Sequence, residues 1–526
     1  MDHGFVLWNE RGNEVPQLAT APDTDVARFD APGVTVATTG GASAESIGAE
    51  YLRTGRIDSP VGPSSVVVHD ERRHRTLAAR DRTGLAPLFH ATTPAGAFGV
   101  STDARSLTAR TGQNPSRIAV AAWLVGAPLA PDETLLARLS RVPAGHVLER
   151  IDDREHLVCV WAPPSPGALP RSAAAEFGPR LEEVVEELTG NTTAAILLSG
   201  GIDSSAVATA AAARLRPLAL SVEFAGASER AVQRLIAAQL GLRHLEAELQ
   251  PDDDLLTRGL DRIAESLWPT PALWAPVFDA LVLEAQAAGA RVVLDGQGGD
   301  DLLDAGIAGG AALLRRPTDF ARWALAERRY TGSALGAARA AVALRLRRTP
   351  ETTLPAWIAP DPSLRAELRD RLASAPRGYA ERRRLDVVDP VLAAQREETY
   401  DRGLRIGMRH LHPLWHPRIV ELLDGLPPAA LVGAGDPKAP ALHYLRSRLE
   451  EPRGAWPRPS LADDLLGRAV SAGVSAAWER FGGGPRRLAA LGVLAETPYL
   501  RDFSLPEIAT TLSLESWIHG LGGEAP

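Results

Sequence analysis

The sequence is poor in two residue types, cysteine and lysine. Cys159 is the only cysteine among 526 residues, which excludes an internal disulfide framework and a zinc or iron–sulfur site built from several cysteines. Lys438 is the only lysine among 57 basic residues. A Walker A phosphate loop would have to end at this lysine, and the residues before it do not fit that pattern. A lone lysine in an arginine-rich chain favours a task that arginine cannot perform, and the alternative is a structural lysine in a chain of biased composition.

The chain also lacks a long apolar run, a targeting signal and a surplus of positive charge. No uncharged stretch is long enough to span a membrane, and the first residues do not show the basic and then apolar pattern of a secretion signal. The net charge of −8 argues against a general nucleic-acid binder. We therefore expect a cytoplasmic protein of about two or three domains, with neither membrane nor nucleic acid as a partner.

The pattern of apolar residues divides the chain into two parts. Residues 1–163 contain short apolar or alternating runs separated by turn residues, which predicts a β-rich domain with one helix within 115–126. The proline-rich stretch 161–172 predicts an exposed linker. From residue 173 predicted helices and strands alternate, and beyond about residue 300 the pattern is almost wholly helical. The predicted fold class is α/β, with a parallel sheet and a helical extension in a second domain, 173–526.

The first motif is LLSGGIDSSAVA at 197–208, which follows an apolar run and opens a predicted helix. Glycines after a strand let the backbone approach a ligand closely, and the helix N-terminus favours an anion. An acid in such a loop suits Mg²⁺ bridging a carboxylate to a phosphate. The alternative is an ordinary glycine turn with a helix cap. The candidate nucleotide-binding residues are Ser199, Gly200, Gly201, Asp203, Ser204 and Ser205.

The second motif is VVLDGQGGDDLLDAG at 292–306, which again places glycines and an acid after a predicted strand. Together the two motifs resemble those of the asparagine synthetase family, within the ATP pyrophosphatases. The resemblance implies an adenine nucleotide alpha hydrolase-like sheet that binds ATP. It also implies that Asp203 and Asp300 share one Mg²⁺ and act in catalysis at the carboxyl edge of the sheet. The nucleotide-binding glycines implied in the second motif are Gly296, Gly298 and Gly299.

The resemblance extends to most of the chain. The segments 80–90, 97–107 and 139–149 are similar to the family's glutaminase domain, a sandwich of the Ntn type, and 408–427 and 436–446 are similar to its C-terminal helices. A working glutaminase of the family needs a cysteine as residue 2, where this sequence has Asp2. The resemblance therefore implies an inactive, degenerate glutaminase-like domain, and an amine that comes from elsewhere.

Family members that combine intact loops with no such cysteine include β-lactam synthetases, carbapenam synthetases and lasso peptide cyclases. All adenylate a carboxylate and then close a lactam, releasing AMP and pyrophosphate. We favour a lasso peptide cyclase that joins the N-terminal amine of a precursor peptide to a side-chain carboxylate. A leader peptidase and a leader-binding protein are then the expected partners. The alternatives are a small-molecule lactam synthetase and a catalytically dead scaffold.

Three features favour the peptide substrate. Gln297 stands where small-ring lactam synthetases have a catalytic tyrosine and asparagine synthetase a glutamate. Residues 313–384 hold 16 Arg against 7 acids, either as solvated helix faces or as a docking surface for an acidic partner. The aromatic stretch 266–281 could line a roomy pocket, although Trp268 and Trp274 could equally be core residues.

Two weaker candidates remain. Lys438 could stabilise negative charge on the adenylate or the tetrahedral intermediate. Family members have a further lysine in the stretch that matches 452–464, where this sequence offers only Arg453 and Arg458. The histidines of HLHPLWH, His410, His412 and His416, have spacing that suits a metal, but a proline interrupts them and no carboxylate lies close by in sequence. We therefore do not predict a metal there.

Overall fold

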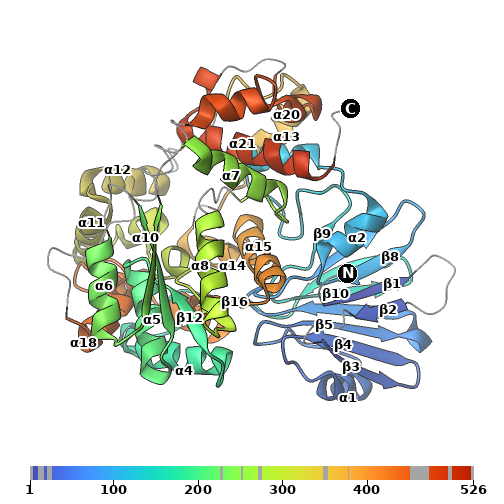
Figure 1. Ribbon diagram of the computed structural model, residues 1–526, viewed down its shortest axis with the longest axis horizontal. Coiled ribbons are helices and arrows are strands. Elements are labelled where there is room, and N and C mark those ends of the chain that lie inside the picture. The colour runs from blue at the N-terminus through green and yellow to red at the C-terminus, as the bar shows by residue number, and fades with distance from the viewer. Residues whose placement is uncertain are drawn as a thin grey trace.

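The structure is a computed structural model of the whole chain (Figure 1). It describes residues 4–9, 17–20, 26–224, 229–249, 253–270, 275–346, 353–376, 378–450, 473–495 and 500–522.

The N-terminal part consists of two antiparallel sheets packed face to face. The first sheet has the order β2-β1-β8-β7-β9 and the second β11-β10-β6-β5-β4-β3. The strands are β1 (Phe5–Asn9), β2 (Gln17–Thr20), β3 (Val26–Ala31), β4 (Val34–Thr39), β5 (Ser65–Asp70), β6 (Arg75–Arg80), β7 (Phe89–Thr92), β8 (Phe98–Ser101), β9 (Ser140–Arg141), β10 (His146–Ile151) and β11 (Arg154–Cys159). Alternating apolar residues of both sheets, among them Leu7, Val67 and Leu148, form the core between them.

Helices cover the two outer faces of this sandwich. The helix α1 (Ala44–Thr54) packs its Tyr51 on the second sheet. The helices α2 (Ala104–Thr111) and α3 (Arg117–Val125) cover the first sheet. The Ser116 hydroxyl caps α3, and Gly126 ends it with a φ of 65°, so the boundaries follow from its flanking residues.

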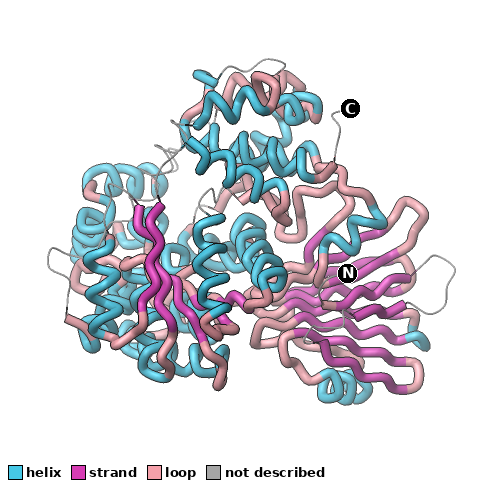
Figure 2. The backbone as a smooth tube through the Cα atoms, in the orientation of Figure 1, coloured by secondary structure: helices cyan, strands magenta, loops and turns pink. Residues whose placement is uncertain are grey.

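The C-terminal part is built on a parallel sheet in the order β14-β13-β12-β15-β16. Its strands are β12 (Ala194–Leu197), β13 (Leu218–Phe224), β14 (His244–Leu249), β15 (Val292–Leu294) and β16 (Arg409–Leu411). All four strand pairs are parallel. The short apolar run of β12 is typical of a strand buried on both faces. Helices pack on both faces of this sheet, as Figure 2 shows.

The remaining elements are helical. They are η1 (Glu71–Arg73), η2 (Arg171–Glu176), α4 (Phe177–Thr189), α5 (Ile202–Arg214), α6 (Arg230–Gln239), α7 (Asp253–Ala264), α8 (Ala275–Ala287), α9 (Gly299–Leu302), α10 (Gly306–Leu313), α11 (Pro317–Thr331), α12 (Ala334–Arg345), α13 (Pro362–Ala373), α14 (Tyr379–Val388), α15 (Pro390–Ile406), η3 (Pro413–Trp415), α16 (Pro417–Gly425), α17 (Pro428–Leu431), α18 (Ala439–Arg448), α20 (Arg486–Ala490), η4 (Leu500–Asp502) and α21 (Leu505–Gly520).

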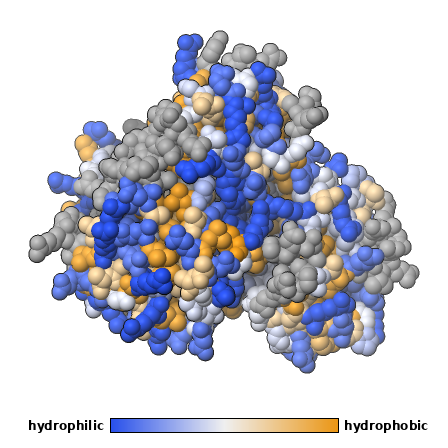
Figure 3. Space-filling view, in the orientation of Figure 1, coloured by the Kyte–Doolittle hydropathy of each residue, from blue (hydrophilic) through white to orange (hydrophobic). Residues whose placement is uncertain are grey.

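Three parts can be followed in Figure 1: the N-terminal sheets on the right, the parallel sheet on the left, and a group of helices with α7, α13, α20 and α21 above. In the space-filling view of this face, hydrophobic residues gather where Figure 1 shows α8 (Figure 3), and Leu283 of α8 is 49% exposed. Among the described residues, no helix has the length and apolar character needed to cross a membrane.

The predicted α/β fold class is confirmed, as is the helix predicted within 115–126. The prediction missed β14 and β16, because their charged and polar residues hide the strand pattern. The predicted linker is not wholly exposed: the backbone N–H groups of Gly167 and Leu169 donate to the carbonyl of Gly425, at 3.0 and 2.8 Å, which fixes the segment on the end of α16. The proposed domain limits of 1–163 and 173–526 remain predictions.

A buried carboxylate, Glu397 of α15, joins the two parts. It accepts hydrogen bonds from Arg80 at 2.8 Å, from Arg141 at 2.9 and 3.0 Å, and from the indole of Trp268 at 2.7 Å. None of these charged side chains is more than 2% exposed. Burial alone would raise the pKa of Glu397, but the two arginines outweigh it and lower the pKa. One ionised glutamate therefore compensates two buried cations.

Replacing Glu397 with Gln is expected to destabilise the protein by about 3–5 kcal/mol, since it leaves two buried guanidinium groups uncompensated. Denaturant unfolding would measure this. Glu367→Gln is the matched control, because Glu367 is half exposed in a surface pair with Arg371 and should change stability by about 1 kcal/mol or less. Equal effects of the two substitutions would contradict the role assigned to Glu397.

Candidate functional site

The first candidate loop, 198–201, joins β12 to α5. Gly200 has a φ of 86°, which residues with a Cβ rarely adopt, and Gly201 is the N-cap of α5. The first N–H groups of a helix have no carbonyl partner within it, so they can bind an anion. The hydroxyls of Ser199 and Ser204 lie 2.9 Å apart beside this turn. The loop thus offers several donors suited to a phosphate.

The second loop follows β15, the strand next to β12, and packs directly against the first. A Cβ on Gly296 would lie 2.6 Å from the backbone nitrogen of Ser204, and one on Gly299 would lie 2.0 Å from Cγ of Asp203. Gly298 has a φ of 95° and abuts Trp415. Close approach between the two motifs therefore requires glycine at positions 296 and 299, in addition to any contact these residues make with a nucleotide.

The ammonium group of Lys438 contacts a carboxylate from each of the two motifs. Lys438 directly precedes α18, and its Nζ contacts Oδ2 of Asp203 and Oδ1 of Asp300, the latter at 2.7 Å. The Lys438 side chain is 3% exposed, whereas those of Asp203 and Asp300 are 18% and 72% exposed. The two carboxylates and the ammonium form a compact group at the carboxyl edge of the parallel sheet, with Asp300 at its solvent side.

The electrostatics of this group follow from burial and from the close charges. Burial raises the pKa of Asp203 to about 6, against the lowering effect of Lys438. Loss of some water around the Asp300 carboxylate would also raise its pKa although the side chain is largely exposed, but Lys438 outweighs this effect and the pKa is lowered. Burial opposes the charge of Lys438, yet the two carboxylates raise its pKa above the ordinary value. The lysine is therefore a permanent cation.

The site fits Mg²⁺. Within the described part of the chain, the buried Oδ1 of Asp203 has no hydrogen-bond partner, which leaves it free to bind a cation. Asp300 presents a second, more exposed carboxylate beside it. Two carboxylate oxygens with the remaining positions left for water and phosphate are the usual ligand set of Mg²⁺.

A cavity of about 570 Å³ adjoins Asp300. Its polar lining includes Asp304, Tyr379 and Asp386, and its apolar lining includes Leu344 of α12. The buried hydroxyl of Tyr379 has no partner among the described residues. Burial raises the pKa of Asp304, and that of Asp386 to about 7. The cavity offers an acidic and partly apolar space next to the candidate nucleotide site.

The structure places the predicted loop residues together, and the hydroxyls of both serines of α5 bond within the motif: that of Ser204 donates to the carbonyl of Gly201 at 3.3 Å. Ser205 is fully buried and donates its hydroxyl to the carbonyl of Gly201 at 2.6 Å, so this hydroxyl is engaged within α5. Gln297 donates its amide to Gln395 of α15 at 3.1 Å. The predictions on Asp2, Trp274, Arg453 and Arg458 fall outside the described residues.

Two interpretations from the sequence change. Trp268 does not line the cavity described above; it is fully buried and donates to Glu397, so core packing was the right alternative. His410 and His412 do have a carboxylate nearby, because Asp295, distant in sequence, lies between them. His416 contacts other groups, with its Nδ1 accepting from the N–H of Arg418.

Sequence reasoning missed Tyr330 of α11. Its hydroxyl donates to Oδ1 of Asp300 at 2.6 Å, and the Lys438 ammonium lies 5.2 Å from its ring centroid. Tyr330 therefore orients the exposed carboxylate and shields the lysine. No motif marks this residue, since it belongs to a helix in the arginine-rich region and reaches the site only through the fold.

A parallel sheet with two glycine-rich loops and converging acids at its carboxyl edge defines an α/β protein with a ligand site at that edge. Comparison with known families matches residues 176–451 to asparagine synthase and residues 40–160 to a glutamine amidotransferase domain. The chain belongs to the asparagine synthase family.

Two individual proteins show similarity as well. The Amidase chyE of Penicillium rubens is 30% identical over 270 residues, which are 46% of this chain and 39% of that protein. The chain thus spans well under half of the length of this relative. The NH3-dependent NAD synthetase of Campylobacter jejuni is 20% identical, with a TM-score of 0.20, over 39% of this chain and 95% of that one.

Lys438→Met is expected to destabilise the protein by about 3 kcal/mol or more, because it leaves the carboxylates of Asp203 and Asp300 without their buried cation. Lys438→Arg should not restore stability fully, since a planar guanidinium is larger than the ammonium that fits between them. Denaturant unfolding measures both. Arg329→Lys, at a half-exposed pair with Asp436, is the control and should change little. Full rescue by arginine would contradict the fit of lysine.

Proposed function

We propose that this protein is an ATP-dependent amide ligase that activates a carboxylate as an acyl-adenylate and releases AMP and pyrophosphate. The observation that carries the proposal is the meeting of Asp203 and Asp300 at Lys438, beside a helix N-terminus that can bind phosphate. Membership of the asparagine synthase family supports the same chemistry.

The residues of the chain have distinct tasks in this proposal. The first-turn N–H groups of α5 and the hydroxyls of Ser199 and Ser204 bind the phosphates. Asp203 and Asp300 hold Mg²⁺, which when bound neutralises charge on the departing pyrophosphate. Lys438 holds both carboxylates in place and adds positive charge close to the phosphates. Activation turns a poor leaving group into a good one, and an amine then attacks.

We further propose that the amine and the carboxylate belong to one precursor peptide, so that the product is a macrolactam, as in lasso peptide cyclases. The cavity of about 570 Å³ beside Asp300 gives room for a peptide end. The cavity is lined by four aspartates against two arginines, Arg382 and Arg383, and this surplus of acid suits a protonated N-terminal amine before reaction. Holding both ends in one site replaces a bimolecular encounter by an intramolecular one.

A leader peptidase and a leader-binding protein are the proposed partners. Part of the arginine surplus at 313–384 is already used within the chain, because Arg329, Arg371 and Arg383 form ion pairs with Asp436, Glu133 and Asp424. The surface left for an acidic partner is therefore smaller than the composition of this region indicates.

Incubation with ATP, Mg²⁺ and a precursor peptide that has a small first core residue and an acid further on is expected to yield AMP, pyrophosphate and a peptide lighter by one water. Asp203→Asn should lower the rate about 100-fold or more, since it removes a charge that holds the cation. Asp153→Asn, at an 80% exposed position, is the matched control. ADP as product would refute the adenylation, and water loss from a small amino acid alone would indicate the small-ring alternative.

The rate should also depend on pH in a defined direction. Asp203 must be ionised to hold Mg²⁺, and burial raises its pKa to about 6. The ionised fraction therefore falls as the pH drops through about 6, and kcat/KM for ATP should fall about tenfold per unit below it. Exchange of labelled pyrophosphate into ATP between pH 5 and 8, values chosen about one to two units around that pKa, measures this. A flat profile over that range would contradict the proposed role of Asp203.

A further inference from the structure

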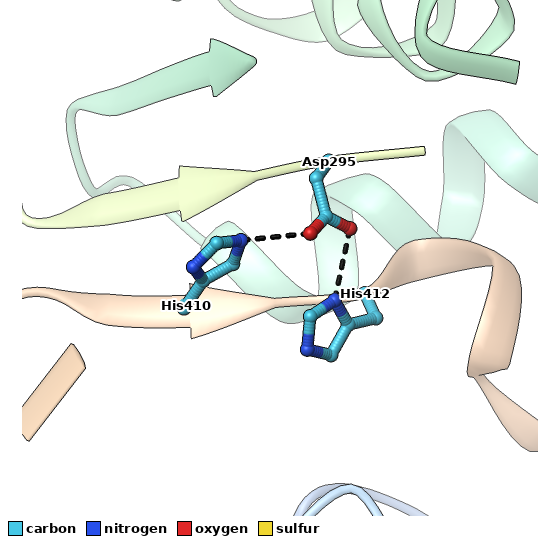
Figure 4. Close-up of side chains that lie close together, drawn as sticks. All are labelled: Asp295, His410 and His412. Carbon is cyan, nitrogen blue, oxygen red and sulfur yellow. Dashed lines mark hydrogen bonds and ion pairs between the residues drawn. The ribbon is translucent and has the colours of Figure 1, made fainter. Parts of the chain in front are cut away.

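A cluster of three metal-ligating side chains lies at the carboxyl ends of β15 and β16. Asp295 directly follows β15, His410 lies within β16, and His412 follows it (Figure 4). The Nε2 of His410 lies 2.8 Å from Oδ2 of Asp295, and the Nδ1 of His412 lies 2.9 Å from Oδ1. The three ligand atoms lie within 4.8 Å of one another.

The fold, not the sequence, creates this cluster. The parallel pairing of Leu294 with Leu411 puts the residues that follow these strands side by side. The side chains of His410 and His412 are 6% and 3% exposed, and that of Asp295 is 15% exposed. The histidine rings stack with centroids 5.1 Å apart, so both imidazoles face the same carboxylate. Such a buried set is fixed in place before any ion arrives.

We propose that Asp295, His410 and His412 form a binding site for one divalent transition metal ion of the zinc type. Two imidazole nitrogens and one carboxylate oxygen are a ligand set that Zn²⁺ uses where water completes the coordination. Mg²⁺ prefers oxygen ligands and is not expected here. The site shares no ligand with the one at Asp203 and Asp300, and it does not depend on the proposed ligase activity.

Residues next to the three ligands connect the proposed metal site to the two glycine-rich motifs. Oδ1 of Asp295 also accepts the N–H of Gln297 at 3.0 Å, which is a contact of the kind that orients metal ligands. Gly296, the next residue after Asp295, packs on Ser204 in the first turn of α5, and Trp415, three residues after His412, packs on Gly298. A bound ion would tie β15 to β16 and fix the second loop against the first.

Cobalt and zinc titrations test the proposal. The full chain is stripped with a chelator, shown by circular dichroism to remain folded, and titrated with Co²⁺ while visible absorption is recorded. One equivalent of Co²⁺ should produce absorption bands that Zn²⁺ then abolishes, and Zn²⁺ should raise Tm by a few degrees. Asp295→Asn and His412→Gln should each remove the bands and the Tm shift.

Two control variants separate this site from other ligands. His443→Gln removes an exposed histidine of α18, and Asp300→Asn removes a carboxylate of the candidate Mg²⁺ site. Both should keep the bands. Absence of stoichiometric Co²⁺ and Zn²⁺ binding by the unmodified protein would overturn the proposal, whether or not the variants fold, and would leave a hydrogen-bonded Asp–His–His group. The proposal would also be overturned if Asp300→Asn removed the bands while Asp295→Asn and His412→Gln kept them.

Discussion

The candidate nucleotide site depends on the buried ammonium group of Lys438. Lys438 lies between two carboxylates that follow different strands of the sheet, and without it Asp203 and Asp300 would repel each other. Burial already pushes Asp203 toward its neutral form, so the lysine is what keeps an ionised pair at this edge. Lys438 is the only lysine of the chain, and all its other Lys or Arg positions hold arginine. At position 438 only a compact charge fits between the two acids.

The same closeness explains why both loops are rich in glycine. Gly296 and Gly299 leave no room for a Cβ because the first turn of α5, which follows the first loop, lies directly against them at Ser204 and Asp203. The glycines of a phosphate-binding motif are usually attributed to the ligand. Here two of the three glycines in the second loop are explained by contact between the two motifs. Each motif can therefore adopt its conformation only when the other lies against it. This interdependence makes the two motifs together more informative than either alone.

The sequence was sufficient to predict which side chains of the site lie together where a motif directly follows a strand. It was insufficient where the packing of distant elements brings the side chains together. Asp203 and Asp300 could be paired because the carboxyl ends of neighbouring parallel strands share an edge. The contact between Asp295 and His410 could not be predicted, because β16 has only three residues and shows no periodicity in the sequence. Tyr330 reaches the site from a helix that carries no motif. Contacts of this kind depend on how distant helices pack, which local pattern does not encode.

The N-terminal half is held in the fold by the contacts it makes with the rest of the chain. Arg80 lies in the segment that resembles a glutaminase signature, yet its guanidinium is buried against Glu397 of α15. The outer face of the first sheet, with Trp8, shares one hydrophobic core with Trp517 of α21. Removing this half would expose both the unpaired glutamate and that apolar surface. The fold of the N-terminal half is therefore maintained by the interface it forms, independently of any amide chemistry of its own.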